Sequence, residues 1–392
     1  MSTSVEEHAA HIRELIAPVV ARREPEGAVL EAALGRVTAA PVHSPVDLPL
    51  FRNSQMDGFA VRAADLPGIL PIAGEVSARP SDPPALQPGT AVRIMTGAVV
   101  PEGADAVVPV EDTVEADGSV TIERVRKVGE FVRARGSDVL QGDELLPAGL
   151  RLGSRHLAVL AAAGLTTVAV RAQVRVAVIT TGSELIEPGA TPTLGQVFDS
   201  NGVALAAAIT AAGAVVCSRV HVGDDTAAML RALTDAALTA DVIITSGGIS
   251  MGDYEVVRET LEPLGATVGH VAMQPGGPQA TAVFEGVPVV CFPGNPVSTQ
   301  LSFEVFLAPL LREAAGLPPA VRETRRVVAE VTSVAGKRQF LRGRAVGEHD
   351  VALVAGPSSH LVAGLAASDL LVVVPEAVVS LTAGDDVEVW HL

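Results

Sequence analysis

The sequence predicts a multidomain protein of the α/β plus β class, in which an α/β domain is combined with smaller β domains. Between residues 174 and 315, apolar segments of β type alternate with helical segments. Residues 53–132 instead contain short, valine-rich runs that proline and glycine interrupt, and similar runs return after residue 322. At about 100–200 residues per domain, a chain of 392 residues has room for two to four domains.

The N-terminal part is predicted to begin with a helix. Between residues 5 and 23, apolar side chains recur at helical spacing, at Ala9, Ile12, Leu15, Ile16 and Val19. The valine-rich runs of residues 53–132 then indicate a small all-β module. Residues 136–170 predict a loop, a helix and a short strand, in that order.

The central region is predicted to form a parallel sheet with helices on both faces. Strands are expected at 174–180, 214–222, 241–246 and 287–292, and helices at 202–212, 226–238, 254–264 and 297–315. In such sheets ligands bind beyond the carboxyl ends of the strands, so functional residues are expected in the turns that follow them. From about residue 322 the runs are short and of β type, which predicts a C-terminal β domain.

The composition is that of a globular protein and excludes two kinds of partner. The chain is 48% hydrophobic and 19% charged, which suffices for packed cores. Its 45 acidic residues exceed the 28 basic ones, of which only Lys127 and Lys337 are lysine, and 3% are aromatic, so nucleic acid is not an expected partner. No apolar run reaches the about 20 residues that span a bilayer, and the acidic N-terminus is unlike a targeting peptide. Two cysteines cannot form a zinc site unaided. We therefore expect a cytoplasmic protein without a membrane partner.

Three strand-to-helix turns of the central region share a composition of glycine, serine and threonine. They contain Thr181, Gly182 and Ser183; Ser246, Gly247, Gly248 and Ser250; and Pro293, Gly294, Asn295 and Pro296. Glycine lets the backbone approach a ligand closely, and the hydroxyls and free amides at a helix start can bind a phosphate or another oxyanion. For the last turn alone, simple helix initiation with Asn295 as N-cap and Pro296 as first helical residue is the favoured interpretation. Three such turns at one sheet edge favour an anion site.

Carboxylates accompany these turns. They are Glu184, Asp199, Asp224, Asp225 and Asp253. A carboxylate repels a neighbouring phosphate unless a divalent cation bridges the two, so Mg²⁺ is the expected metal. The alternative is that acids in the first helical turn complement the helix dipole, and it stays open above all for Asp224 and Asp225.

The N-terminal half holds two polar segments that the residue types alone do not separate from ordinary turns. They are residues 53–60, NSQMDGFA, and residues 93–98, RIMTGA. The spacing of a Ser/His/Asp triad and a lysine-containing phosphate loop are both missing from the sequence. Four scattered histidines, His156, His221, His270 and His360, are expected in solvent or core positions rather than at a metal.

Eight segments of the chain, taken together and in order, resemble the MoeA family, molybdopterin molybdenumtransferase. They are NSQMDGFAV, RIMTGAVVPEGADAVVPVE, GSDVLQGDELL, VAVITTGSEL, FDSNG, ITSGGISMGDYE, FPGNPVS and VVVPE. The resemblance implies an elongated homodimer with a MogA-like parallel α/β sandwich domain, a small β module inserted N-terminally and a C-terminal β-barrel-like domain. The implied boundaries are 1–52 with 135–171 for a discontinuous linker and dimerisation domain, 53–134 for the β module, 172–321 for the α/β domain and 322–392 for the C-terminal domain.

The resemblance also implies a reaction and partners. Molybdate would be inserted into the dithiolene of adenylylated molybdopterin (molybdopterin-AMP), with Mg²⁺-dependent release of AMP. A molybdopterin adenylyltransferase of the MogA type would supply the substrate, and molybdoenzymes or their chaperones would receive the product.

Individual residues take roles from the resemblance. Asp57, Thr96 and Asp138 match family positions that reach the site from the partner subunit in a dimer, and Glu184, Asp224 and Asp253 match acids associated with metal, pterin and catalysis. Glu184 and Asp253 are the expected metal ligands. The three turns match the pterin-nucleotide cradle, and Arg338, Arg342 and Ser359 match positions expected to donate to molybdate.

One segment departs from the family pattern. Where the family has Lys-Pro-Gly-Lys-Pro, this chain has Gln274-Pro275-Gly276-Gly277-Pro278, so both lysine positions are neutral. A charge-assisted hydrogen bond contributes about 1.5–3 kcal/mol, so two such donors are a substantial loss. The departure motivates an alternative to the insertase: a protein that binds molybdopterin or its nucleotide without inserting metal. A third interpretation, a nucleotide hydrolase on a shared MogA-like domain as in CinA-type proteins, does not account for the N-terminal segments.

Overall fold

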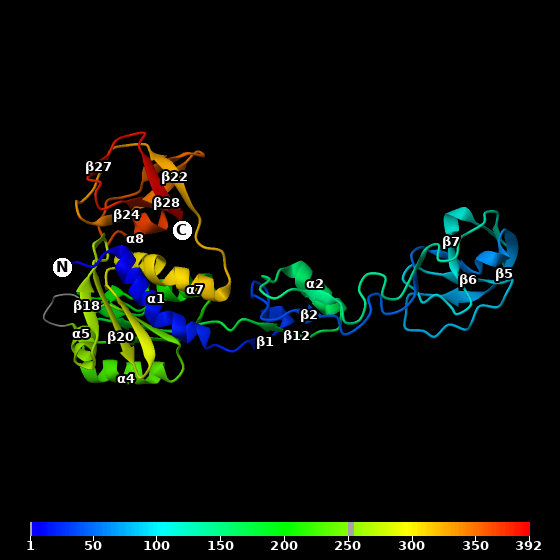
Figure 1. Cartoon of the computed structure of the whole chain (residues 1–392), viewed down its shortest axis with the longest axis horizontal. Helices are drawn as coiled ribbons and strands as arrows, with labels where there is room; N and C mark the ends of the chain where they lie inside the picture. The colour runs from blue at the N-terminus through cyan, green and yellow to red at the C-terminus, as the bar shows by residue number, and fades with distance from the viewer. Residues whose placement is uncertain (1, 250–254) are drawn as a thin grey trace. The chain divides into compact units, whose positions relative to one another are not determined.

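The chain forms two compact units, and each is described by itself. The structure, a computed structural model, describes residues 2–249 and 255–392. One unit combines Met1–Glu26 with Arg171–Leu392, and the other is Gly27–Val170. Figure 1 shows the elements of both units along the chain. No helix among the described residues is long and apolar enough to cross a membrane.

The first unit is built around a six-stranded sheet with the strand order β16-β13-β17-β21-β20-β18. The strands are β16 (Val215–Val222), β13 (Arg175–Thr181), β17 (Val242–Ser246), β21 (Val287–Phe292), β20 (Pro278–Phe284) and β18 (Thr267–His270). The four strands predicted from the sequence pair in parallel. β20 and β18 were not predicted, and they extend the sheet in antiparallel pairing.

Helices cover both faces of this sheet, as predicted, and each face has its own apolar core. On one face lie α3 (Ser200–Ala211), α6 (Pro296–Ser302), the π-helical turn η5 (Phe303–Leu307) and α7 (Ala308–Ala315). On the other lie α4 (Thr226–Ala237) and α5 (Val256–Leu261). Figure 1 shows α4 and α5 on the side of the sheet opposite to α7.

The N-terminal helix α1 (Val5–Ala21) packs on the α/β domain. Ser4 caps it by accepting a hydrogen bond from the Glu7 amide, and Glu7 accepts one from the Ser4 amide in return. Its apolar stripe, with Ile12 and Ile16 fully buried, joins the core of the sheet face that carries α7. The structure therefore groups residues 1–26 with the α/β domain, whereas the predicted boundary groups them with the linker domain. Burial of that stripe against the sheet is the physical reason.

The C-terminal residues form a closed β-barrel, as predicted. Its strands are β22 (Arg322–Val327), β24 (Arg338–Val346), β25 (Asp350–Leu353), β26 (Leu370–Val374) and β28 (Asp386–His391). The pairing of β24 with β26 closes the ring. One short strand of the α/β domain, β19 (Met273–Gln274), joins this barrel by pairing with β24, with Gln274 opposite Gln339. This pairing anchors the Gln274 loop to the C-terminal domain.

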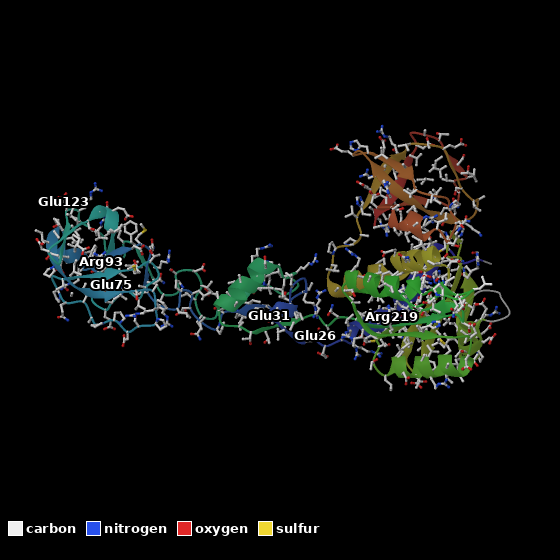
Figure 2. The ribbon with its side chains drawn as sticks, turned by 180° about the vertical axis from the view of Figure 1, so that it is seen from behind. Glu26, Glu31, Glu75, Arg93, Glu123 and Arg219 are labelled. Atoms are coloured by element: carbon white, nitrogen blue, oxygen red, sulfur yellow. The ribbon has the colours of Figure 1, made fainter. Side chains whose placement is uncertain are left out.

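The second unit contains the predicted β module and the segments that flank it. The module is a six-stranded sheet made of β4 (Gly58–Val61), β5 (Gly68–Val76), β6 (Ala91–Ile94), β7 (Ala106–Pro109), β8 (Val114–Ala116) and β9 (Ser119–Ile122). Figure 2 labels Glu75 and Arg93, which are register partners on β5 and β6. The flanking part pairs β1 (Glu26–Val29) with β12 (Thr167–Val170) and β2 (Val42–His43) with β11 (Glu144–Leu146), beside α2 (Ser154–Ala162).

Candidate functional site

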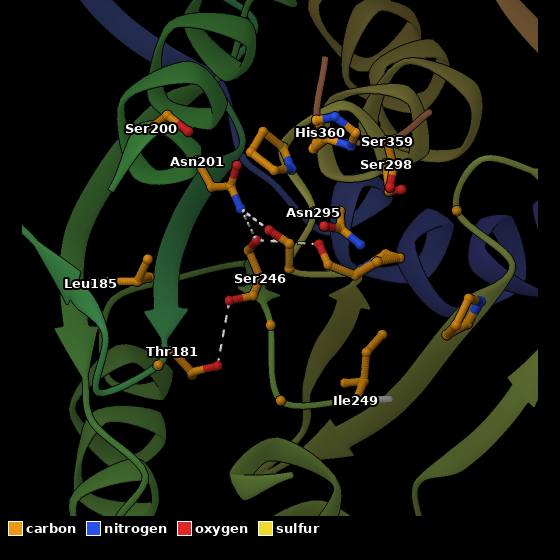
Figure 3. A pocket seen from close by; sticks show the side chains of 18 of the residues that line it. Thr181, Leu185, Ser200, Asn201, Ser246, Ile249, Asn295, Ser298, Ser359 and His360 are labelled. Carbon is orange, nitrogen blue, oxygen red and sulfur yellow. Dashed lines mark hydrogen bonds between the residues drawn. The ribbon is translucent and has the colours of Figure 1, made fainter. Parts of the chain in front are cut away.

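A cavity of about 1040 Å³ lies where the parallel strands of the α/β domain end. Thr181 ends β13 and Ser246 ends β17, while Pro293 directly follows β21, and all three line the cavity. The carboxyl ends of parallel strands meet at one edge of a sheet, so the three predicted turns come together there. Figure 3 shows the cavity from close by.

In the first turn, the carboxylate of Glu184 packs against Gly182. Gly182 has a φ of +137°, and a Cβ at this position would lie 2.5 Å from Oε2 of Glu184. Ser183 and Asp224 are joined by two hydrogen bonds of 3.1 Å, because the Ser183 amide donates to Oδ2 of Asp224 and the Asp224 amide donates to Oγ of Ser183. Glu184 and Asp224 therefore both border this turn, and both line the cavity.

The second turn requires glycine. Gly247 has a φ of +97°, and a Cβ there would meet the Thr181 carbonyl oxygen at 2.8 Å. Gly248 has a φ of +66°, and its Cβ would lie 3.0 Å from the amide nitrogen of Val257. The close approach of the first and second turns thus depends on the missing side chains. Ser250 and Asp253, also expected here, lie outside the described residues.

The third turn differs from its prediction in one respect. Asn295 is the N-cap residue of α6 and Pro296 the first helical residue, as expected, but the Asn295 side chain makes no capping hydrogen bond. The amide side chain instead lines the cavity, where Figure 3 shows it. Gly294 permits close packing, because a Cβ there would lie 3.2 Å from the Cα of Gly247. A ligand in the cavity can therefore use the amide of Asn295.

Asn201 connects two of the turns, and it was not among the predicted site residues. Its Nδ2 donates hydrogen bonds to Oγ of Ser246 at 2.9 Å and to the carbonyl oxygen of Gly294 at 2.7 Å. Asn201 is buried, and its Oδ1 has no hydrogen-bond partner among the described residues. An unpaired buried acceptor is costly, which points to a ligand donor. The signal was the segment FDSNG, which contains the N-cap and first residues of α3 and does not follow a strand of the six-stranded sheet.

The acids divide into capping residues and cavity residues. Asp225 is the N-cap of α4 and accepts a hydrogen bond from the Ala228 amide at 2.5 Å, which supports the structural alternative for this residue. Asp199 caps α3 and accepts from Oγ1 of Thr180 at 2.9 Å, yet it also lines the cavity. The carboxylates that line the cavity are Glu184, Asp199, Asp224 and Glu255.

The donor set of the cavity suits a hard cation. Carboxylate, hydroxyl and carbonyl oxygens are the ligands that Mg²⁺ takes, and one or two carboxylates are enough when phosphates and water complete its shell. Among the described residues there is no group of three or more His, Cys, Asp or Glu side chains arranged to hold a metal. The observed carboxylates therefore fit Mg²⁺ shared with a ligand and do not form an all-protein metal cage.

The C-terminal donors do not all reach the cavity. Ser359 lines it, and its carbonyl oxygen accepts a hydrogen bond from the Val297 amide at 3.1 Å. Arg342 is buried and donates to the carbonyl oxygens of Gly356 and Ser358, so it holds the loop that carries Ser359. Burial lowers the pKa of Arg342.

Arg338 lies in a different place. Its guanidinium is paired with Glu6 and with Glu376, at 3.0 Å from the latter, and it lines a separate cavity of about 410 Å³. The structure thus brings Ser359 into the main cavity, connects Arg342 to it through a loop, and does not bring Arg338 there. The reason is the acidic pair that neutralises Arg338, which the sequence pattern does not reveal.

Residues 274–278, where both lysine positions of the family are neutral, form the neutral segment. This segment borders the cavity through Gln274, Pro275, Gly276 and Pro278. Oε1 of Gln274 accepts a hydrogen bond from Nε2 of Gln339 at 2.7 Å. A Cβ on Gly277 would lie 2.5 Å from Nε2 of His270, so the imidazole of His270 occupies the space that a side chain at residue 277 would need. Among the described lining residues there is no lysine or arginine, and His360 is the basic side chain.

Asp57, Thr96 and Asp138 belong to the second unit. Oδ1 of Asp57 accepts hydrogen bonds from the amide of Thr96 at 2.6 Å and from its Oγ1 at 2.9 Å. These bonds, the backbone one foremost, hold the pKa of Asp57 below its ordinary value. Asp138 lies in an exposed loop, where its amide donates to the carbonyl oxygen of Leu48 at 2.9 Å. The main cavity is lined by residues of the first unit.

Fold and cavity together define the class: a multidomain α/β protein with a cavity at the carboxyl ends of its parallel strands, bordered by glycine-containing turns. Three family models match the chain, described as "MoeA N-terminal region (domain I and II)" over residues 3–164, "Probable molybdopterin binding domain" over 177–313 and "MoeA C-terminal region (domain IV)" over 324–392. The chain belongs to the MoeA family, the molybdopterin molybdenumtransferases, which are enzymes of molybdenum cofactor biosynthesis. The resemblance found in the sequence is confirmed.

Relatives match over most of their length. Molybdopterin molybdenumtransferase 2 of Mycobacterium tuberculosis is 42% identical over 408 residues, covering 99% of each chain. Molybdopterin molybdenumtransferase of Nostoc sp. is 38% identical over 326 residues, which are 80% of this chain and 75% of that one. The crystal structure of a molybdopterin biosynthesis MoeA protein from Pyrococcus horikoshii is 32% identical, with a TM-score of 0.78, and the match covers 100% of this chain and 99% of that one.

Proposed function

We propose that this chain is a molybdenum insertase, which transfers molybdate into molybdopterin-AMP with Mg²⁺-dependent release of AMP. One observation carries the proposal: glycine turns suited to phosphate and the carboxylates of Glu184 and Asp224 share one cavity. A ligand that joins a pterin to a nucleotide needs both an anion cradle and buried polar partners. The turns supply the first, and the unpaired Oδ1 of Asn201 supplies an acceptor for a ligand N–H.

The chain's own residues bind and orient the substrate in this scheme. The second turn, which contains Gly247 and Gly248, faces the phosphates, and Asn201 keeps this turn aligned with Gly294. Glu184 and Asp253 are proposed to hold Mg²⁺, and Asp224 borders the same turn as Glu184 through the hydrogen bond that it accepts from the Ser183 amide. When bound, Mg²⁺ supplies Lewis-acid stabilisation of the charge that develops on the phosphoanhydride oxygens.

The test is AMP release from purified full-length protein loaded with molybdopterin-AMP. We expect AMP release that molybdate stimulates and that requires Mg²⁺. Glu184→Gln should fold normally and lose AMP release by about a hundredfold or more, because an electrostatic group in the transition state contributes about 10²–10³. Glu187→Gln is the matched control, since Glu187 is an exposed acid of the following loop whose carboxylate pairs with Arg219. Full turnover by Glu184→Gln would remove this residue from the metal site.

The second candidate is a protein that binds molybdopterin-AMP without inserting metal. It is favoured by the neutral Gln274 and by a cavity without lysine or arginine among its described lining residues. The two functions differ in the response of AMP release to molybdate. Molybdate stimulates AMP release from an insertase, whereas a carrier binds the nucleotide tightly and its AMP release does not change with molybdate. The same assay on Gln274→Lys then shows whether a cation at this position restores insertion.

We propose further that the chain acts as a cytoplasmic homodimer, supplied by a MogA-type adenylyltransferase and serving molybdoenzymes or their chaperones. The family resemblance supports this, together with the exposed, hydrogen-bonded pair of Asp57 and Thr96 on the second unit. In a dimer, these residues and Asp138 would act at the site of the partner subunit. Mixing inactive Asp57→Asn subunits with inactive Glu184→Gln subunits should then restore part of the activity. Mixtures that stay inactive would contradict shared sites.

A further inference from the structure

The main cavity carries more negative than positive charge, although its proposed substrates are anions. The described lining residues include four carboxylates, those of Glu184, Asp199, Asp224 and Glu255, and no lysine or arginine. Arg338 is paired with Glu6 and Glu376, and Arg342 donates to backbone carbonyl oxygens. Neither guanidinium lines this cavity, so neither offers its charge directly to an oxyanion there.

His360 is the basic side chain that does line the cavity. Its Nδ1 lies 2.8 Å from Oγ of Ser358, so Nδ1 is already hydrogen-bonded and Nε2 is the ring atom left for a ligand. When Ser358 donates to Nδ1, the proton of the neutral ring is on Nε2, and in the protonated ring both nitrogens carry a proton. With either of these rings, an oxyanion in the cavity would meet an Nε2–H donor.

Hydrogen bonds from Arg342 and from the start of α6 fix the loop that carries His360. Arg342 donates to the carbonyl oxygens of Gly356 and Ser358, and the Val297 amide donates to the carbonyl oxygen of Ser359 at 3.1 Å. Figure 3 shows His360 and Ser359 beside Ser298, on the other side of Asn295 from Thr181 and Leu185. The first turn, with its carboxylates, thus lies at one side of the cavity. The hydroxyls of Ser298 and Ser359, the amide of Asn295 and the imidazole of His360 lie away from that turn.

The neutral segment cannot take the same role without rearrangement. Oε1 of Gln274 accepts a hydrogen bond from Gln339, and the Cβ of any side chain at residue 277 would lie 2.5 Å from the ring of the exposed His270, which would have to move aside. In this conformation, the side-chain donors for an oxyanion in the cavity therefore come from other elements that border it.

Resting on the proposed function, we propose that His360 binds the tetrahedral oxyanion, molybdate, through its Nε2–H. It takes the role that lysine side chains would have at Gln274 and Gly277. Ser359 and Ser298 flank it as hydroxyl donors, and Arg342 is a positioning residue that acts through the Ser358 carbonyl.

The test measures molybdate and nucleotide binding separately. Full-length protein is dialysed to equilibrium against molybdate, with and without saturating molybdopterin-AMP, and bound molybdenum is determined by mass spectrometry; nucleotide affinity is measured by titration with molybdopterin-AMP. The variants are His360→Gln, which is neutral, and His360→Lys, which restores a permanent charge. His349→Gln is the control, because the His349 side chain is 77% exposed in the same barrel domain and does not line the cavity.

We expect His360→Gln to raise the Kd for molybdate about tenfold or more, as loss of a charge-assisted hydrogen bond implies, while the Kd for molybdopterin-AMP changes less than about twofold. His360→Lys should keep molybdate affinity near that of the parent, and His349→Gln should change neither constant. An unchanged molybdate Kd in His360→Gln would overturn the assignment. So would an equal loss of nucleotide affinity, which would place His360 on a phosphate of the nucleotide. Failure of the parent protein to bind molybdopterin-AMP would instead reject the proposed function itself.

Discussion

Nδ2 of Asn201 lies 2.9 Å from Oγ of Ser246 and donates a hydrogen bond to it, within the buried floor of the main cavity. The same nitrogen donates to the carbonyl oxygen of Gly294. One side chain of α3 therefore holds together the two turns that follow β17 and β21. This link makes the relative position of those turns, and so the shape of the anion cradle, sensitive to a single residue.

The first prediction concerns this link. Asn201→Ala removes both hydrogen bonds, although the Ser246 hydroxyl keeps its contact with Thr299 and Gly294 is exposed, so the free energy of unfolding should fall by about 1–2 kcal/mol. The affinity for molybdopterin-AMP should fall about tenfold, because the two turns lose their alignment. Denaturant unfolding and nucleotide titration measure the two effects. Thr210→Ala on the same helix is the control, since Oγ1 of Thr210 only donates to the carbonyl oxygen of Ala206. Equal effects of both variants would refute the special role of Asn201.

The second prediction separates backbone strain from collision at a glycine. Gly247 and Gly265 have similar φ values, +97° and +91°, but a Cβ at Gly247 meets the Thr181 carbonyl oxygen at 2.8 Å whereas nothing lies within 4 Å of a Cβ at Gly265. Gly265→Ala should lower the unfolding free energy by about 1–2 kcal/mol through strain alone. Gly247→Ala should cost clearly more and abolish nucleotide binding. Thermal unfolding measures the stability of both variants, and titration measures their affinity for the nucleotide. Equal stability of the two variants would contradict a collision between the Cβ at residue 247 and the Thr181 carbonyl oxygen.

The third prediction uses two adjacent acids with different partners. Asp225 caps α4, so Asp225→Ala should lower the unfolding free energy by about 1 kcal/mol and leave molybdopterin-AMP binding unchanged. Asp224 accepts from the amide of Ser183 at the first turn, so Asp224→Ala should weaken Mg²⁺-dependent nucleotide binding. The comparison is made by titration with and without Mg²⁺. If Asp225→Ala lost binding as well, the division of roles between the two acids would be wrong.

The fourth prediction concerns pH and the docking of α1. His8 is buried with its ring edge-on to Phe306, and burial first, then the neighbouring His11, lowers the pKa of His8 to about 4. The unfolded chain then binds a proton at higher pH than the folded one, so stability falls as pH drops through about 6.5 and goes on falling toward about 4. The loss should reach about 3 kcal/mol at the lower end of this range. His8→Phe should lack this component in denaturant unfolding curves measured from neutral pH to about pH 4; identical pH dependence in both proteins would contradict it.

The fifth prediction tests the contact between Gly277 and His270. Gly277→Ala places a Cβ at 2.5 Å from the ring of His270, which is exposed and can turn to another rotamer, so the unfolding free energy should fall by about 0.5–1.5 kcal/mol. His270→Ala should remove most of this penalty, which a double-mutant cycle measures as a coupling energy. Gly269→Ala is the matched control, because nothing lies within 4 Å of a Cβ there. Additive effects of the two substitutions would show that the ring and the added methyl do not meet.

Much of the fold follows from local patterns. The apolar runs of β13, β16, β17 and β21 and the helical spacing of α1 could be recognised because burial on one or both faces imposes a period on the sequence. β18 and β20 could not, since Thr267–His270 and Pro278–Phe284 mix glycine, proline and polar residues and form strands through antiparallel pairing at the edge of the sheet.

The candidate site likewise contains residues that sequence patterns reveal and residues that they do not. The three glycine turns and their acids were found because strand ends of a parallel sheet must meet at one edge. The roles of Asn201, His270 and His360 were not found, because each depends on a neighbour distant in sequence or on a loop held from behind. Arg338 was misplaced for the same reason: its position in the chain does not show that Glu6 and Glu376 neutralise it.

The sequence by itself determined the family, the order of the domains and the turns that border the cavity, because these depend on residue type and spacing along the chain. Only the tertiary structure decided which charges reach the cavity. It buried Arg342 behind a loop, paired Arg338 with two acids and left His360 at the cavity wall. Long-range packing sets these partners, and a side chain's charge acts on a ligand only where packing leaves it unpaired.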